Sequence, residues 1–127
     1  MHPHWLNLED CIIIHDKSLE QFGGANGIRD NGLLESAIAR PQQLLHYGTA
    51  SLYELAASYV YGIIKNHPFI DGNKRTGFIA GALFLQSNGL MLIASEEDAL
   101  AYTVALAASD ITEKDYANWL SKSCQDV

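Results

Sequence analysis

The sequence feature that most restricts the fold is a polar break at residues 67–72, between two long apolar helical patterns. The first pattern opens with Ser51 and Glu54, which are spaced as a capping box and therefore mark a helix start. Its apolar residues recur at helical spacing up to the break. Pro68 disfavours α geometry at the residue before it, so we expect the helix to end there. The break is thus predicted to be a short loop between two helices.

The second pattern is predicted to form a helix that begins near Asp71 or Gly72 and runs to Asn88. It is apolar around much of its circumference, which is typical of a helix buried at the centre of a protein. Gly77 and Gly81 lie one turn apart within it. Because glycine costs about 1 kcal/mol relative to alanine inside a helix, we expect these two glycines to let a neighbouring helix approach closely.

The rest of the chain contains further helical patterns, each with its own start or stop signal, and one short extended run at residues 90–94. We therefore predict an all-α protein, a single domain over residues 1–127 built as a bundle of about six helices. The predicted N-caps outside the central pair are Asn7, Asp30 or Asn31, Ser95 and Thr112. The predicted stops are Gly23 with Gly24, Pro41, and Asn88 with Gly89.

Residues 41–49, which begin at Pro41, follow no clear period. Two interpretations stay open for this segment. It is either a plain connector or a short flap loop that offers backbone and polar groups to a partner. The side chains that a flap would offer are Gln42, Gln43, His46 and Tyr47.

The formal charge of the chain is -7 at pH 7, which argues against direct binding of nucleic acid over a broad surface. Yet three of its eight Lys and Arg residues, Lys65, Lys74 and Arg75, lie in or beside the break. That local excess indicates a small anion site. The chain shows neither a signal sequence nor an apolar run long enough to cross a membrane. Its two separated cysteines, Cys11 and Cys124, favour a reducing, cytoplasmic location.

The start of the second helix has the composition of a phosphate site. A helix N-terminus presents unpaired backbone N–H groups and a partial positive charge, which together attract anions. Gly72 is expected to let an anion approach the backbone, and Asn73 to orient either the loop or a phosphate oxygen. Lys74 and Arg75 add full charges, the arginine as a bidentate fork.

Three other residues of the break have predicted roles. His67 continues the apolar face of the first helix, so we expect it to point inward; histidine titrates near neutral pH and suits general-base catalysis. Asp71 is either an N-cap or a ligand for Mg²⁺. Phe69 is expected to anchor the loop in the core. Phosphoryl and nucleotidyl transfer require positioning, charge neutralisation and a base, which these residues supply. His15, on an apolar stripe, is predicted to be a hydrogen-bonded core histidine instead.

The break and the first residues of the second helix, His67-Pro-Phe-Ile-Asp-Gly-Asn-Lys-Arg75, resemble the motif of the Fic/Doc family. That motif has a histidine, any residue, a phenylalanine, then an acidic residue and an Asn-containing turn that ends in arginine. Residues 19–42 and 84–89 also look like the death-on-curing (Doc) branch. The resemblance therefore covers nearly the whole chain and implies the Fic/Doc fold.

Fic enzymes usually transfer AMP from ATP to a hydroxyl and carry glycine where this chain has Lys74. The Doc pattern, Asn-Lys-Arg-Thr, implies that ATP binds in the reversed sense and that its γ-phosphate is transferred. It also implies a toxin that phosphorylates a threonine of translation elongation factor Tu, halts protein synthesis and is neutralised by a small antitoxin. ATP and Mg²⁺ would be required. His67 would be the base and Asp71 would hold Mg²⁺ or order the loop.

Two alternatives to a kinase remain open. Pro68 and Gly72 are more typical of Fic proteins at large, which favours an AMP transferase on the same scaffold. The third interpretation is a non-catalytic binding module that keeps the fold and acts through partner contacts.

Overall fold

The computed structural model describes all residues, 1–127, and contains six α-helices and two short strands. The helices are α1 (Leu8–Phe22), α2 (Asn31–His46), α3 (Leu52–Asn66), α4 (Asn73–Ser87), α5 (Glu96–Ala107) and α6 (Glu113–Lys122). The strands are β1 (Leu90–Leu92) and β2 (Cys124–Asp126), which pair antiparallel. The prediction of an all-α bundle of about six helices is confirmed, whereas the C-terminal strand was not predicted.

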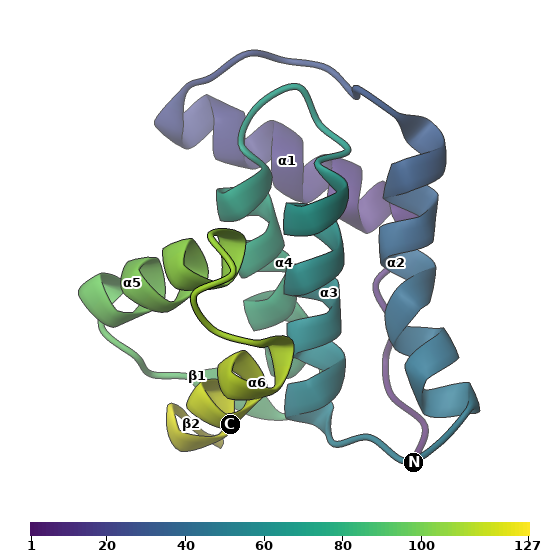
Figure 1. Cartoon of the computed structure of the whole chain (residues 1–127), viewed down its shortest axis with the longest axis vertical. Helices are drawn as coiled ribbons and strands as arrows, with labels where there is room; N and C mark the ends of the chain where they lie inside the picture. The colour runs from purple at the N-terminus through teal and green to yellow at the C-terminus, as the bar shows by residue number, and fades with distance from the viewer.

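Helix α3 is the centre of the molecule, and α2, α4, α5 and α6 all contact it (Figure 1). Its closest neighbour is α4, because the two helices meet at glycines. A Cβ atom added to Gly81 would lie 2.5 Å from Val60 Cγ2 and 3.3 Å from the Ala56 carbonyl oxygen of α3. At Gly77 the added atom would lie 3.2 Å from the Val60 carbonyl oxygen. The close approach predicted for these glycines is confirmed.

The predicted helix starts agree with the structure. Complete capping boxes open three helices, with Asn7 and Asp10 in α1, Ser51 and Glu54 in α3, and Thr112 and Asp115 in α6. The side chains of Asp30 and Ser95 cap α2 and α5. Helix α4 is the exception, since its N-cap is Gly72 and no side chain caps it. Its first turn therefore keeps backbone N–H groups that no cap satisfies.

The prediction that Pro41 ends a helix is wrong, because α2 continues through Pro41 to His46. Proline has no N–H to donate to the carbonyl of Ala37, one turn earlier, and costs about 3 kcal/mol in a helix interior. That carbonyl faces α3 instead: its oxygen lies 3.3 Å from the position that a Cβ of Gly62 would take. Pro41 is itself buried, so packing of α2 on α3 outweighs the lost hydrogen bond. The candidate flap at residues 41–49 is thus mostly helix, and only a short connection precedes α3.

Two connections lie together at one end of the molecule, at the top of Figure 1. One is the central loop, residues 67–72, which joins α3 to α4. The other is the strap, residues 23–30, which joins α1 to α2 and passes beside the central loop. Cys11 and Cys124 are both free thiols, and burial raises the pKa of Cys11 to about 12. None of the helices has the length and apolarity needed to cross a membrane.

Candidate active site

His67 lies immediately after α3 and is exposed. It has φ 50° and ψ 53°, a left-handed conformation that costs a residue with a Cβ roughly 1–2 kcal/mol. Its backbone N–H still donates to the Ile63 carbonyl oxygen at 3.1 Å, which ends the helix. The prediction that His67 points inward is wrong. The helical period cannot be continued beyond Asn66, because the left-handed residue turns the chain away from the apolar face of α3.

Phe69 fixes the central loop in the core. Its side chain is fully buried and stacks on the ring of His15, with ring centroids 3.8 Å apart. The side chain of Asn73, also buried, accepts from the Phe69 backbone N–H at 3.0 Å and donates to the Phe69 carbonyl oxygen at 2.9 Å. The Asn73 side chain therefore orients the loop, and only its backbone remains to face an anion.

His15 supports the loop from α1. It is buried, and its Nε2 lies 2.8 Å from the carbonyl oxygen of Asp71. A carbonyl can only accept, so Nε2 carries the proton and donates. The prediction of a hydrogen-bonded core histidine is confirmed. Its bond also ties α1 to the residue just before the start of α4.

The Asp71 side chain is exposed and orders the loop. Its Oδ2 accepts from the Ala25 backbone N–H at 3.1 Å, and its Oδ1 accepts from the Gly72 backbone N–H at 2.9 Å. The Ala25 bond first, and the Gly72 bond second, hold the pKa of the Asp71 carboxyl below its usual value. Gly72, not Asp71, is the N-cap of α4, so the suggested N-cap role of Asp71 is wrong. Asp71 is an ionised carboxylate at neutral pH, at the edge of the helix N-terminus.

The N-terminus of α4 presents free charges beside these unsatisfied N–H groups. Lys74 and Arg75 are both exposed. The guanidinium of Arg75 lies over the ring of Phe22, 4.3 Å from its centroid, an aromatic contact that sequence analysis missed. Gly72 has φ 79°, a left-handed backbone conformation that glycine adopts without steric cost, so this conformation accounts for a glycine at the position. A Cβ there would lie 3.8 Å from the His15 ring, in ordinary contact with α1, and the approach of an anion at Gly72 stays a prediction.

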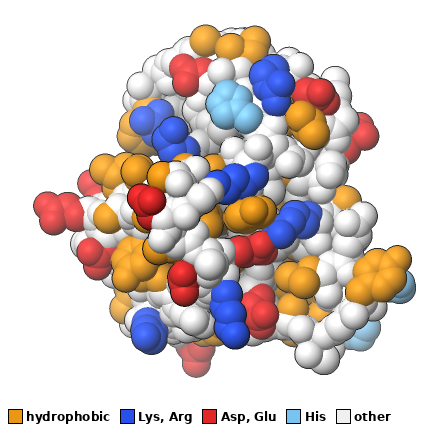
Figure 2. Space-filling view, viewed as in Figure 1, with side chains coloured by type: hydrophobic (Ala, Val, Ile, Leu, Met, Phe, Trp, Pro, Cys, Tyr) orange, Lys and Arg blue, Asp and Glu red, His pale blue; other side chains and the backbone are white.

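Figure 2 shows an exposed histidine at the end of the molecule where the central loop projects, with Lys and Arg side chains near it. The central loop and the start of α4 thus carry, within residues 67–75, an exposed imidazole, an ionised carboxylate and two exposed cations, from His67, Asp71, Lys74 and Arg75. This combination can bind a phosphate group, neutralise its charge and take a proton from an incoming hydroxyl.

The strap supports the central loop, a role that was not predicted from the sequence. The Ile70 backbone N–H donates to the Gly27 carbonyl oxygen at 3.0 Å, and Ile28 and Phe69 form an isolated antiparallel bridge. The Arg29 side chain also donates to carbonyls at the end of α3. Nothing in the turn-rich composition of residues 23–30 indicates this pairing, because its partners lie some forty residues away along the chain.

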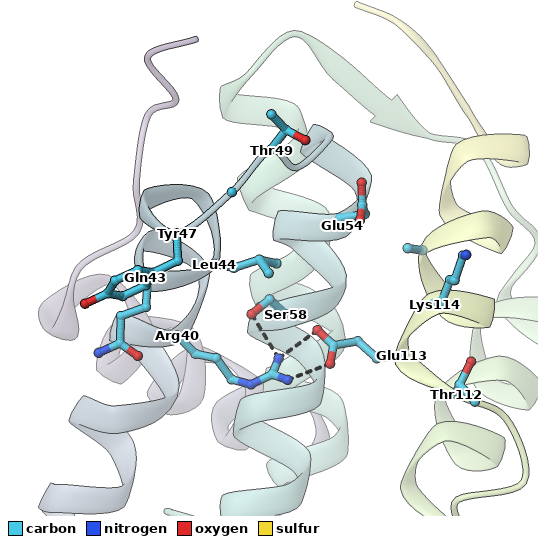
Figure 3. A pocket seen from close by; sticks show the side chains of 12 residues that line it. Arg40, Gln43, Leu44, Tyr47, Thr49, Glu54, Ser58, Thr112, Glu113 and Lys114 are labelled. Carbon is cyan, nitrogen blue, oxygen red and sulfur yellow. Dashed lines mark hydrogen bonds and ion pairs between the residues drawn. The ribbon is translucent and has the colours of Figure 1, made fainter.

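A cavity of about 780 Å³ lies at the opposite end of α3, in a groove between α2, α3 and α6 (Figure 3). None of the predicted site residues lines it. Arg40 reaches across the groove, where its Nη2 donates to Glu113 Oε1 at 2.6 Å and its Nη1 to Ser58 Oγ at 3.0 Å. The hydrogen-bonding groups of Arg40, Glu113 and Ser58 are therefore paired with one another.

Comparison with known proteins identifies the family of this chain. The model of the Fic/DOC family matches residues 5–85. The chain is 34% identical to the protein kinase doc of Escherichia phage P1 over 115 residues, which is 90% of each protein. It is 43% identical to the toxin Doc of Mycolicibacterium smegmatis over 76 residues, 58% of each protein. The chain therefore belongs to the Fic/DOC family, in its Doc toxin branch.

Proposed function

We propose that this protein is a kinase toxin that transfers the γ-phosphate of ATP to a hydroxyl of a target protein. The proposed target is a threonine of translation elongation factor Tu, whose phosphorylation would inhibit translation. The observation that carries the proposal is the start of α4, where no side chain caps the helix and Lys74 and Arg75 are exposed close in sequence to the exposed His67. The kinase name of the phage relative supports the same activity.

The phosphates of ATP would bind at the N-terminus of α4. Its backbone N–H groups and the positive end of its dipole favour an anion. Arg75 would donate two parallel hydrogen bonds to phosphate oxygens, and Lys74 would act as a compact charge. Because Arg75 rests on the ring of Phe22, its guanidinium is held near the helix start by a contact that leaves its N–H groups able to donate.

The donor set at the site fits a magnesium ion that arrives with the nucleotide. No three His, Cys, Asp or Glu side chains gather anywhere in the chain as a ready metal site. Mg²⁺ is instead commonly held by one or two carboxylates together with substrate phosphates and water. Asp71 is ionised and exposed, and each of its carboxylate oxygens accepts one hydrogen bond, which leaves lone pairs for a ligand. Bound Mg²⁺ would neutralise charge on the phosphates during transfer.

His67 would act as the general base. Its side chain is exposed, so a hydroxyl on a folded target protein can reach it. One imidazole nitrogen would take the hydroxyl proton as the oxygen attacks the γ-phosphorus, and the bond to the β-phosphate oxygen would break to release ADP. The two cations and the helix N-terminus would stabilise the charge that develops on the phosphates.

A test of this function uses the purified protein, elongation factor Tu and ATP labelled at either the α or the γ position. Label from the γ position on the target, and none from the α position, is the expected result. Label from the α position would reject the kinase and support the alternative of an AMP transferase, which Pro68 and Gly72 favour.

The toxin relatives imply a partner for this chain, a cognate antitoxin that neutralises it. We expect both to act in the cytoplasm, where elongation factor Tu is found. A growth test separates catalysis from a pure binding function. Expression of the parent should stop growth, and expression of His67→Ala should not. Equal toxicity of the two would favour the binding module instead.

A further inference from the structure

Arg29, in the strap, contacts the end of α3 through its backbone and its side chain. Its Nε donates to the His67 carbonyl oxygen at 2.7 Å, and its Nη2 donates to the Asn66 carbonyl oxygen at 2.9 Å. The backbone N–H groups of Arg29 and Asp30 donate to the Pro68 carbonyl oxygen at 2.6 and 3.0 Å. Three consecutive carbonyls, at residues 66–68, are therefore bound by two neighbouring residues of the strap.

The two side-chain bonds define the conformation of His67. The Asn66 carbonyl belongs to the peptide plane before the His67 Cα, and the His67 carbonyl belongs to the plane after it. The rotations of these planes about the Cα are φ and ψ, which set the direction of the Cα–Cβ bond. The guanidinium is a rigid fork, so a single side chain holds both planes. Arg29 thereby fixes the direction in which the imidazole leaves the backbone.

The charge of Arg29 suits this position. The last carbonyls of a helix are unpaired within it and carry a partial negative charge, which a cation stabilises. Arg29 forms no ion pair, and its guanidinium bonds only to backbone carbonyls. It therefore compensates a left-handed residue that lacks glycine's freedom, at the point where α3 ends.

The rest of the central loop has other supports. Asn73 bonds to Phe69, His15 bonds to the Asp71 carbonyl, and the Ile70 N–H bonds to the strap. These contacts hold residues 69–71. Loss of the guanidinium removes only the bonds to residues 66 and 67, so the loop would keep its anchor while His67 gains freedom.

We infer that Arg29 is a positioning residue for His67, which it holds in its left-handed conformation through the two carbonyls that flank it. The inference rests on the proposed role of His67 as the general base. A base that wanders from its productive direction slows the chemical step, and a displacement of about 1 Å can cost roughly 100-fold in rate. Binding of ATP at the start of α4 does not involve Arg29, so its affinity should be unaffected.

The test compares Arg29→Ala, Arg29→Lys and Arg40→Ala with the parent in phosphoryl transfer to elongation factor Tu. Arg40 is the matched control, since it too donates to two partners, but at the groove. We expect kcat to fall about 10- to 100-fold in Arg29→Ala with KM for ATP unchanged, and Arg29→Lys to recover part of the loss. Arg40→Ala should keep the parental kcat. An unchanged kcat in Arg29→Ala, or an equal loss in Arg40→Ala, would overturn the inference.

A second readout works without activity, and so separates this inference from the proposed function. The imidazole signals of His67 in NMR spectra are assigned by their loss in His67→Gln. In Arg29→Ala these signals should shift and broaden, while those of the buried His15 stay in place. If Arg29→Ala fails to fold, Arg29→Gln, which keeps a neutral donor, takes its place. Parental His67 signals in the folded variant would refute the positioning role even in a protein that transfers no phosphate.

Discussion

Charged side chains lie near both ends of α3, but they are paired at one end and exposed at the other. At the groove end, the cavity of about 780 Å³ is lined by Arg40 and Glu113, which pair with each other. At the loop end, backbone hydrogen bonds fix the central loop, and the side chains of His67, Lys74 and Arg75 are exposed. The difference teaches that a large cavity does not by itself identify a site of catalysis or ligand binding. A site needs charged groups that the protein has left without partners of their own.

Substitution of His67 gives the largest expected difference between the ends. His67→Gln should lower the rate of phosphoryl transfer by roughly 10²- to 10⁴-fold, because the incoming hydroxyl loses its base. Thermal unfolding should show little change, since the side chain is exposed. At the groove end, Glu113→Gln should leave transfer at the parental rate. Comparable rate losses in both variants would remove the distinction.

Substitution of Arg75 tests the anion site itself. Arg75→Ala should weaken ATP binding by roughly 1.5–3 kcal/mol, about 10- to 100-fold in Kd, through loss of charge-assisted hydrogen bonds to phosphate. Titration calorimetry measures this change. Lys114→Ala removes an equal charge from the lining of the groove and should leave the affinity unchanged. Weaker ATP binding in the Lys114 variant alone would indicate that the nucleotide binds in the groove instead.

Substitution of Arg40 should separate stability from activity. Arg40→Ala breaks the pair with Glu113 and leaves the hydroxyl of Ser58, which is fully buried, without its partner. We expect a loss of about 1–3 kcal/mol in the free energy of unfolding. Urea unfolding measures the loss, and a double-mutant cycle with Glu113→Gln isolates the share of the ion pair. A loss of ATP affinity in this variant would contradict a purely structural groove end.

Two aspartates give the smallest and most selective difference. Hydrogen bonds from backbone N–H groups lower the pKa of both carboxyls. The main donor is the Ala25 N–H for Asp71 at the loop end, and the Thr112 N–H for Asp115 beside the groove. A lowered folded pKa stabilises the protein above the unfolded value of about 3.9, and this contribution is lost as the pH falls through the folded pKa. Asp71→Asn and Asp115→Asn should therefore each destabilise the protein slightly at neutral pH and not in acid.

Magnesium then distinguishes the two carboxylates. Asp71→Asn should raise the Mg²⁺ concentration needed for half-maximal transfer, whereas Asp115→Asn should not. Unfolding curves from pH 7 down to about pH 3 measure the first effect, and a Mg²⁺ titration of activity measures the second. Identical Mg²⁺ dependence in both variants would argue against Asp71 as a ligand.

Much of the fold could be predicted because its signals are local. A capping box such as Ser51 with Glu54 lies within one turn, and the glycines of α4 report close packing by their cost alone. Pro41 misled the prediction because its local penalty is outweighed by contacts between α2 and α3, which no local pattern reveals. The β2 strand is too short for a sequence pattern to predict it, because it forms only by pairing with β1.

The composition of the site could be predicted, but not its geometry. The charges and the helix start at residues 71–75 follow from the sequence, since they are neighbours in it. The direction of His67 does not, because one left-handed residue redirects the side chain. Arg29 is 38 positions from His67, and its role depends on how two loops meet in space.

The proposed function requires that the phosphates of ATP bind at the start of α4, and amide NMR of the protein titrated with Mg-ATP tests this directly. We predict that the largest shifts occur at the backbone amides of Asn73, Lys74 and Arg75, at the uncapped start of α4. Shifts concentrated instead at Gly48, Thr49 and Lys114, which line the groove, would contradict the account.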